Sequence, residues 1–153
     1  MEYLYNCRRR NLPEKIIFRF RFLLFERYSM KYGFEVPINV FGPGLSIAHK
    51  GTIVVNPYSK VGSNCRIHVG VNIGNYAPLD ENWVPDNVPV LGNNVYIGPG
   101  AKLYGKITIG DNASIGANAV VNKDVPAGVT VAGVPAKIIS SKSSNVVHGD
   151  ENY

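Results

Sequence analysis

The stretch LGNNVYIGPGAKLYGKITIGDNASIGANAVV, residues 91–121, places an aliphatic residue at every sixth position. The same spacing of six extends upstream to residue 41, with one longer step before residue 55 and another before residue 91. The apolar residues in this register are Phe41, Ile47, Val55, Val61, Ile67, Ile73, Leu91, Ile97, Leu103, Ile109, Ile115 and Val121. Because 45% of the chain is hydrophobic, chance would fill all these positions with a probability on the order of 1 in 10,000. The period therefore decides the fold.

A fixed period this short is typical of a solenoid, in which each unit buries its apolar side against its neighbours. Six residues cannot hold a helix, so we expect short parallel strands joined by tight turns. Small or aliphatic residues recur four positions after the period residues, as at Ala113 and Ala119, and form a second inward position. Gly and Asn between them accept the backbone angles of a corner. The sequence predicts an all-β solenoid over residues 35–139.

Two breaks in the period locate irregular segments. Two extra residues enter near His49, and about twelve polar and Pro-containing residues enter at 79–90, where we expect a projecting loop. Residues 140–153 carry no repeat and are predicted to be a flexible tail. Residues 1–34 are predicted to be a basic helical segment, with the helix running from Pro13 to about Tyr32.

The whole formal charge of +5 lies within residues 1–34, and the rest of the chain is balanced. This distribution gives no reason to expect that the solenoid binds nucleic acid. The apolar residues of the predicted helix spread over more than one face. Two interpretations stay open: the helix packs on the solenoid or a neighbouring subunit, or residues 8–31 dock on an anionic membrane surface. No signal peptide or transmembrane helix is indicated, so the expected location is the cytoplasm, at the inner face of the membrane if residues 8–31 dock there.

Three motifs carry a family resemblance: residues 91–102, residues 109–121 and the closing VAGVPAK at 131–137. With the hexads, they resemble the hexapeptide-repeat acyltransferases, whose fold is a left-handed parallel β-helix. Within that family, GPGLSIAH at 42–49 and GTIVV at 51–55 resemble the serine O-acetyltransferases and relatives that acetylate polysaccharide sugars. The resemblance implies a homotrimer, or a hexamer built from trimers, that binds acetyl-CoA between adjacent solenoids.

Acetyl transfer to an alcohol needs a base that takes the hydroxyl proton. The chain has three histidines, His49, His68 and His148, of which His148 lies in the predicted tail. His49 lies in the two-residue register break, and the resemblance places the catalytic histidine there. It also places the carboxylate that orients this histidine near Glu35, with one residue fewer between them than in the serine branch. His49 as an ordinary surface histidine is the alternative, and His68 is a candidate substrate contact.

The resemblance also implies coenzyme contacts. Lys123 and Lys137 match basic positions that meet the coenzyme, and small residues at Pro99, Ala101 and Ala117 match positions beside its pantetheine arm. Cys65 occupies an inward position, which indicates a buried thiol, and the spacing of Cys and His suggests no metal site. We therefore expect direct transfer without an acyl-enzyme.

The acceptor is less well specified. The serine branch has an Arg-His-Pro triplet where this chain has Asn87-Val88-Pro89, and the predicted loop offers Asp80, Glu81 and Trp83, which suit sugar hydroxyls. The first interpretation is an O-acetyltransferase that acts on a sugar in surface polysaccharide synthesis. Serine O-acetylation is the alternative, and a non-enzymatic solenoid scaffold is the second alternative.

Overall fold

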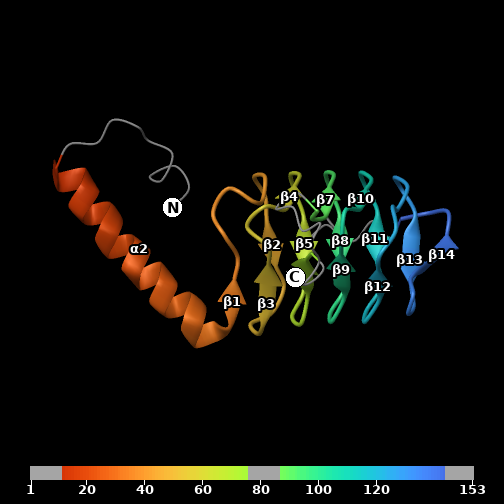
Figure 1. Ribbon diagram of the computed structural model, residues 1–153, viewed down its shortest axis with the longest axis horizontal. Helices are drawn as coiled ribbons and strands as arrows, with labels where there is room; N and C mark the ends of the chain where they lie inside the picture. The colour runs from red at the N-terminus through yellow and green to blue at the C-terminus, as the bar shows by residue number, and fades with distance from the viewer. Residues whose placement is uncertain (1–11, 76–86, 144–153) are drawn as a thin grey trace, which may run out of the picture.

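The computed structural model describes residues 12–75 and 87–143 as one helix followed by a stack of short strands. The helix is α2 (Leu12–Tyr32). The strands are β1 (Phe34–Glu35), β2 (Ser46–Ile47), β3 (Ile53–Val55), β4 (Lys60–Val61), β5 (Arg66–Ile67), β6 (Asn72–Gly74), β7 (Val90–Leu91), β8 (Tyr96–Ile97), β9 (Lys102–Tyr104), β10 (Thr108–Ile109), β11 (Ser114–Ile115), β12 (Val120–Val121), β13 (Thr130–Ala132) and β14 (Lys137–Ser140). Figure 1 shows the strands as successive rungs along the long axis of the molecule.

The strands form three sheets, and each coil of the chain contributes one segment to each sheet. The strand orders are β1-β3-β6-β9-β12, β4-β7-β10 and β2-β5-β8-β11-β13-β14. Isolated bridges from Phe41 to Val61 and from Ile109 to Val125 extend the second sheet by one coil at each end. All pairs are parallel except β13 with β14, which are antiparallel. The predicted solenoid is confirmed as a three-sided parallel β-helix.

The core consists of the residues that the period selected. Every apolar residue of that register is buried except Ile47, which is 39% exposed. Its strand β2 lies at the end of its sheet, so no further coil stacks on it. The second inward position is buried in the interior coils as well, and Ala101, Ala113 and Ala119 have no exposed surface. A stack of this kind buries its interior coils and leaves its terminal coil partly open.

One corner of the β-helix is built from a column of asparagines. Asn64, Asn94 and Asn112 have φ angles of 58°, 55° and 58°, a left-handed conformation that Asn tolerates better than most residues. Asn64 Nδ2 donates to Asn94 Oδ1 at 3.2 Å, and Asn94 Nδ2 donates to Asn112 Oδ1 at 3.1 Å. The column therefore satisfies the corner backbone and links three coils.

We expect Asn94→Ala to destabilise the protein more than Asn94→Gly, by about 1 kcal/mol. Both variants lose the two ladder hydrogen bonds, but only alanine is strained at positive φ. The control is Asn122, an exposed corner residue outside the left-handed region. Its glycine variant should be no more stable than its alanine variant. Denaturant unfolding of the four variants measures this order, and equal stability of the two Asn94 variants would contradict it.

Helix α2 extends away from the β-helix (Figure 1). It is anchored near its C-terminal end, where the Tyr32 and Phe34 ring centroids are 6.5 Å apart and Lys50 Nζ lies 5.6 Å from the Tyr32 ring centroid. Its exposed apolar side chains are Ile16, Ile17, Phe20, Leu23, Leu24, Tyr28, Met30 and Tyr32. Only its C-terminal part, from Phe22 onward, lies close to the first coil of the solenoid. Within the described residues, no helix is both long and apolar enough to cross a membrane.

Two predicted boundaries shift. Most of the predicted loop, with Asp80, Glu81 and Trp83, lies outside the described residues. Val88 and Pro89 are buried and β7 begins at Val90, so the chain rejoins the coil before the predicted end of the loop at 90. The predicted flexible tail also starts too early, because Ser140 is in β14 and Thr130 Oγ1 donates to the carbonyl oxygen of Lys142 at 2.8 Å.

Candidate active site

His49 lies at the corner between β2 and β3, where the sequence has its two-residue break. The backbone N–H of Ala48 donates to the Ile67 carbonyl oxygen at 3.1 Å, so the chain stays in register with the next coil up to that point. His49 itself is exposed. The extra residues widen the corner and leave this imidazole outside the core, accessible to a substrate.

The structure brings His68 next to His49. Their ring centroids are 5.7 Å apart, and the centroid of His68 is 5.2 Å from that of Tyr96, with the rings at 63°. Arg66 pairs in register with Tyr96 across β5 and β8. Ile67 is fully buried, so Arg66 and His68 on either side of it project from the outer face. We call His49, Arg66, His68 and Tyr96 the histidine cluster.

Sequence reasoning missed two members of this cluster. Arg66 and Tyr96 were not selected as candidates, although a signal for Arg66 was present. Alternation places residues 66 and 68 on the same face of a strand, and an arginine two positions from a candidate histidine is a natural binding partner. The contribution of Tyr96 depends on pairing between coils thirty positions apart, which spacing alone does not reveal.

The cluster has a distinct electrostatic character. Burial lowers the pKa of His68, and the positive charges of Arg66 and His49 lower it further. Since the usual value is about 6.5, His68 is neutral near pH 7 and has one N–H donor and one acceptor nitrogen. His68 therefore adds no positive charge to that of its neighbour Arg66 at this pH.

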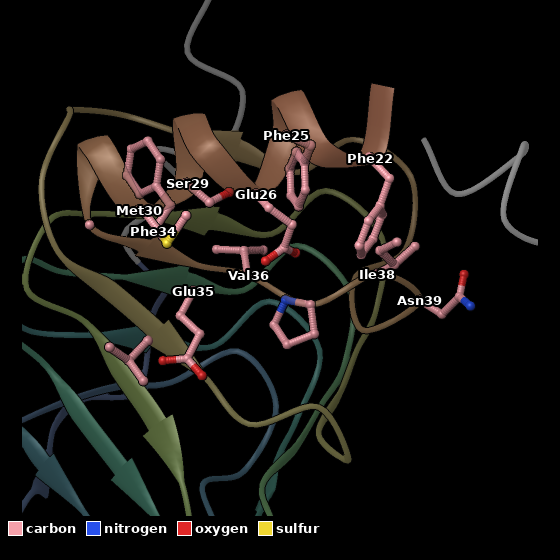
Figure 2. A pocket seen from close by; sticks show the side chains of 13 residues that line it. Phe22, Phe25, Glu26, Ser29, Met30, Phe34, Glu35, Val36, Ile38 and Asn39 are labelled. Atoms are coloured by element: carbon pink, nitrogen blue, oxygen red, sulfur yellow. The ribbon is translucent and has the colours of Figure 1, made fainter. Parts of the chain in front are cut away.

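Glu35, the predicted partner of His49, lies on β1 and lines a cavity of about 720 Å³ between α2 and the first coil. Figure 2 shows Glu26 extending from the helix among Phe22, Phe25 and other apolar side chains, while the carboxylate of Glu35 points away from α2. Among the described residues, no hydrogen bond or ion pair joins Glu35 to His49. The pairing of these two residues stays a prediction.

This cavity is not the place where transfer chemistry is favoured. Among the residues that the structure describes, no histidine lines it, and its walls are mostly apolar. The base that the reaction needs lies instead at the corner after β2.

The residues expected to contact the coenzyme fall into three groups. Pro99 and Ala117 are exposed at the same corner of successive coils, and the N–H of Asn118 donates to the Pro99 carbonyl oxygen at 2.8 Å. Lys123 and Lys137 are exposed on the last coil and on β14. Ala101 is fully buried in the core, and a coenzyme contact at this residue stays a prediction.

Cys65 is buried, and burial raises its pKa to about 12. The thiolate is the nucleophilic form of cysteine. This thiol is therefore protonated at neutral pH and enclosed by the core, so it cannot act as an acyl carrier.

Comparison with known proteins supports the predicted repeat family. Residues 89–123 match the family described as bacterial transferase hexapeptide (six repeats). These repeats support the left-handed winding of the β-helix.

Relatives found by sequence and by structure include serine acetyltransferases. The protein from Synechococcus elongatus is 40% identical over 98 residues, which are 64% of this chain and 38% of that protein. The Brucella abortus enzyme in complex with coenzyme A is 37% identical with a TM-score of 0.60, over 68% of this chain and 41% of that one. The Neisseria gonorrhoeae enzyme in complex with serine is 39% identical with a TM-score of 0.59, over 65% and 39%. This chain thus spans about two fifths of the length of these three relatives.

Proposed function

We propose that this protein is an acetyl-CoA-dependent O-acetyltransferase and that its acceptor is serine. The observation that carries the proposal is the exposed His49 beside His68, at the widened corner of a β-helix similar to those of serine acetyltransferases. The sugar acceptor expected from the sequence is not supported by the comparisons, because the relatives found are named for serine. Serine O-acetylation, the alternative given by the sequence, therefore replaces sugar O-acetylation.

The chemistry follows from the exposure of the imidazole. A neutral alcohol is a weak nucleophile, and His49 takes its proton as the oxygen attacks the thioester carbonyl carbon of acetyl-CoA. The C–S bond then breaks, and the protonated His49 returns the proton to the departing thiolate. Glu35, if it turns from its cavity toward His49, orients the ring and stabilises the imidazolium. With Cys65 buried, transfer is direct.

The chain offers surfaces that fit the coenzyme. Its phosphates are anionic, and Lys123 and Lys137 are solvent-exposed cations at the C-terminal end of the β-helix. Pro99 and Ala117 are small, exposed corner residues that allow a thin chain to approach the backbone. The N–H of Gly100 donates to the Val69 carbonyl oxygen, so the corner that carries Pro99 and Ala117 continues onto the coil of His68 and leads toward the histidine cluster.

Replacing both Lys123 and Lys137 with alanine should weaken acetyl-CoA binding by about 1–3 kcal/mol, the scale of charge-assisted contacts. The affinity of the variant should also depend less on salt. Calorimetry at two ionic strengths measures both effects. The matched control is the double variant Lys60→Ala with Lys106→Ala, which replaces two other exposed lysines. An acetyl-CoA affinity that is unchanged in both double variants would mean that Lys123 and Lys137 do not contact the coenzyme.

We base a homotrimer, or a hexamer built from trimers, on two features. These are the exposed apolar residues of α2 and the exposed corner that carries His49. Exposed apolar surface of this extent usually marks an interaction site, and closed cyclic symmetry covers it with identical copies. Such an assembly would place the corner of one β-helix beside its neighbour and enclose the coenzyme between them. A membrane docking role for α2 is the competing interpretation.

An acceptor screen tests the proposed function. The protein is incubated with acetyl-CoA and with serine, threonine, or a panel of neutral and acidic sugars, and the released thiol is measured. We expect thiol release above the hydrolysis background with serine. Release with a sugar but not with serine would restore the polysaccharide interpretation, and no release with any acceptor would favour the scaffold.

A further inference from the structure

Two side-chain nitrogen atoms of the histidine cluster lack hydrogen-bond partners. Arg66 Nε and His68 Nε2 are buried atoms for which no partner exists in the part of the chain that the structure describes. Most buried polar groups in folded proteins are hydrogen-bonded, so each exception calls for an explanation. The two atoms lie on the same strand face, and both residues are beside Tyr96.

The charge of the cluster indicates what would satisfy these two nitrogen atoms. Arg66 forms no ion pair among the described residues, and His49 and Arg66 both act on His68 as positive neighbours. The groups that face His68 are thus Arg66 on its own strand, His49 on the preceding coil and Tyr96 on the following one. None of them carries a negative charge near neutral pH. The cluster is therefore a site for an anion.

Arginine is well suited to one kind of anion. Its planar guanidinium presents N–H groups in a fork that matches the two oxygens of a carboxylate. A serine molecule has its carboxylate and its hydroxyl on adjacent carbon atoms, so the two groups together span about one rung of a sheet, roughly 4.8 Å. His49 lies one rung away from the coil that carries Arg66 and His68.

We infer that Arg66 binds the carboxylate of the acceptor, with His68 as a second donor, and so presents the acceptor hydroxyl to His49. This inference rests on the proposed function and names its specificity residue. It also accounts for the Asn87-Val88-Pro89 stretch. None of these three residues has a charged side chain, so that stretch supplies no cation, and Arg66 takes over the recognition of the carboxylate.

The kinetic test compares L-serine with L-serinamide, which keeps the hydroxyl and lacks the carboxylate. Arg66→Gln should lower kcat/KM for serine by about 10- to 100-fold, while kcat/KM for serinamide changes by less than about 3-fold. Arg66→Lys should recover part of the loss because it restores the charge but not the fork. Lys60→Gln, an exposed cation on β4, is the matched control and should change neither value.

Two kinetic results would overturn the inference. Equal losses for serine and serinamide would give Arg66 a structural role. A raised KM for acetyl-CoA with an unchanged KM for serine would assign Arg66 to a coenzyme phosphate instead of the acceptor carboxylate.

A binding readout separates this inference from the proposed function. In NMR titrations of the wild type, L-serine should raise the pKa of His68, because a carboxylate at Arg66 offsets the charge that lowers it. Serinamide should not raise it, and Arg66→Gln should raise it without any ligand. If serine raises the pKa of His68 but is not acetylated, the carboxylate site at Arg66 stands and the proposed function fails. If serine is acetylated and leaves the pKa of His68 unchanged, the inference fails alone.

Discussion

Replacing His49 with alanine should lower the turnover number for acetyl transfer by about two to four orders of magnitude, the usual contribution of a positioned base. The side chain is exposed and makes no core contact, so folding and acetyl-CoA affinity should stay close to wild type. Steady-state kinetics with the acceptor found in the screen, together with calorimetry of coenzyme binding, measure the two properties separately. His148→Ala, a histidine near the C-terminus, is the control and should retain activity.

A substitution of Glu35, the predicted partner of His49, should give a smaller loss of activity. Glu35→Gln should cost less than His49→Ala, because it removes orientation and charge stabilisation but not the proton acceptor. Activity of His49→Ala within a few-fold of wild type would mean that His68 or water accepts the proton. Wild-type activity in Glu35→Gln would leave Glu35 as a residue of the cavity beneath α2.

Ile97→Ala should destabilise the protein by about 2–5 kcal/mol, the range for truncating a buried isoleucine. Ile97 has no exposed surface and lies in register between Ile67 and Ile115, which are also fully buried. The cavity left by the missing atoms cannot close easily, because the strands on both sides are fixed by their own ladders. Since the free energy of unfolding of a domain is typically only about 5–15 kcal/mol, this one substitution would remove a large part of it.

Denaturant unfolding at a fixed protein concentration measures this loss, since association would otherwise shift the result. Ile97→Val should cost only about 0.5–1.5 kcal/mol. Thr108→Ala, at an exposed strand position, should have little effect. A loss at Ile97 no larger than at Thr108 would contradict the stacked core described for the β-helix.

The sequence predicted the fold well because the β-helix is nearly one-dimensional. Each coil contacts only its neighbours, so a local period of six identifies both the strand and its buried side. The inward positions, such as Ile67 and Ala113, followed directly from that period. Ile47 departs from it because burial also depends on the number of coils stacked on a residue, and β2 ends its sheet.

The candidate site was less predictable, for the same structural reason. Its members come from different coils, and the long insertion between β6 and β7 hides which residues stack. Arg66 lies beside Tyr96 only because β5 pairs with β8 across that insertion. At Ala101 two sequence signals disagree. Its position in a family motif suggested a coenzyme contact, whereas its position in the period of six places it in the core, where the structure has it.

The most direct measurement of the central claim follows the acetyl group itself. Acetyl-CoA labelled with ¹³C at the carbonyl carbon is incubated with L-serine and the protein, and the label is traced by NMR. We expect the signal to move into the ester carbonyl of O-acetylserine with the wild type and to remain in the thioester with His49→Ala. Ester formation at equal rates in both proteins, or none with the wild type, would contradict the proposal that the corner at His49 is the active site of a serine O-acetyltransferase.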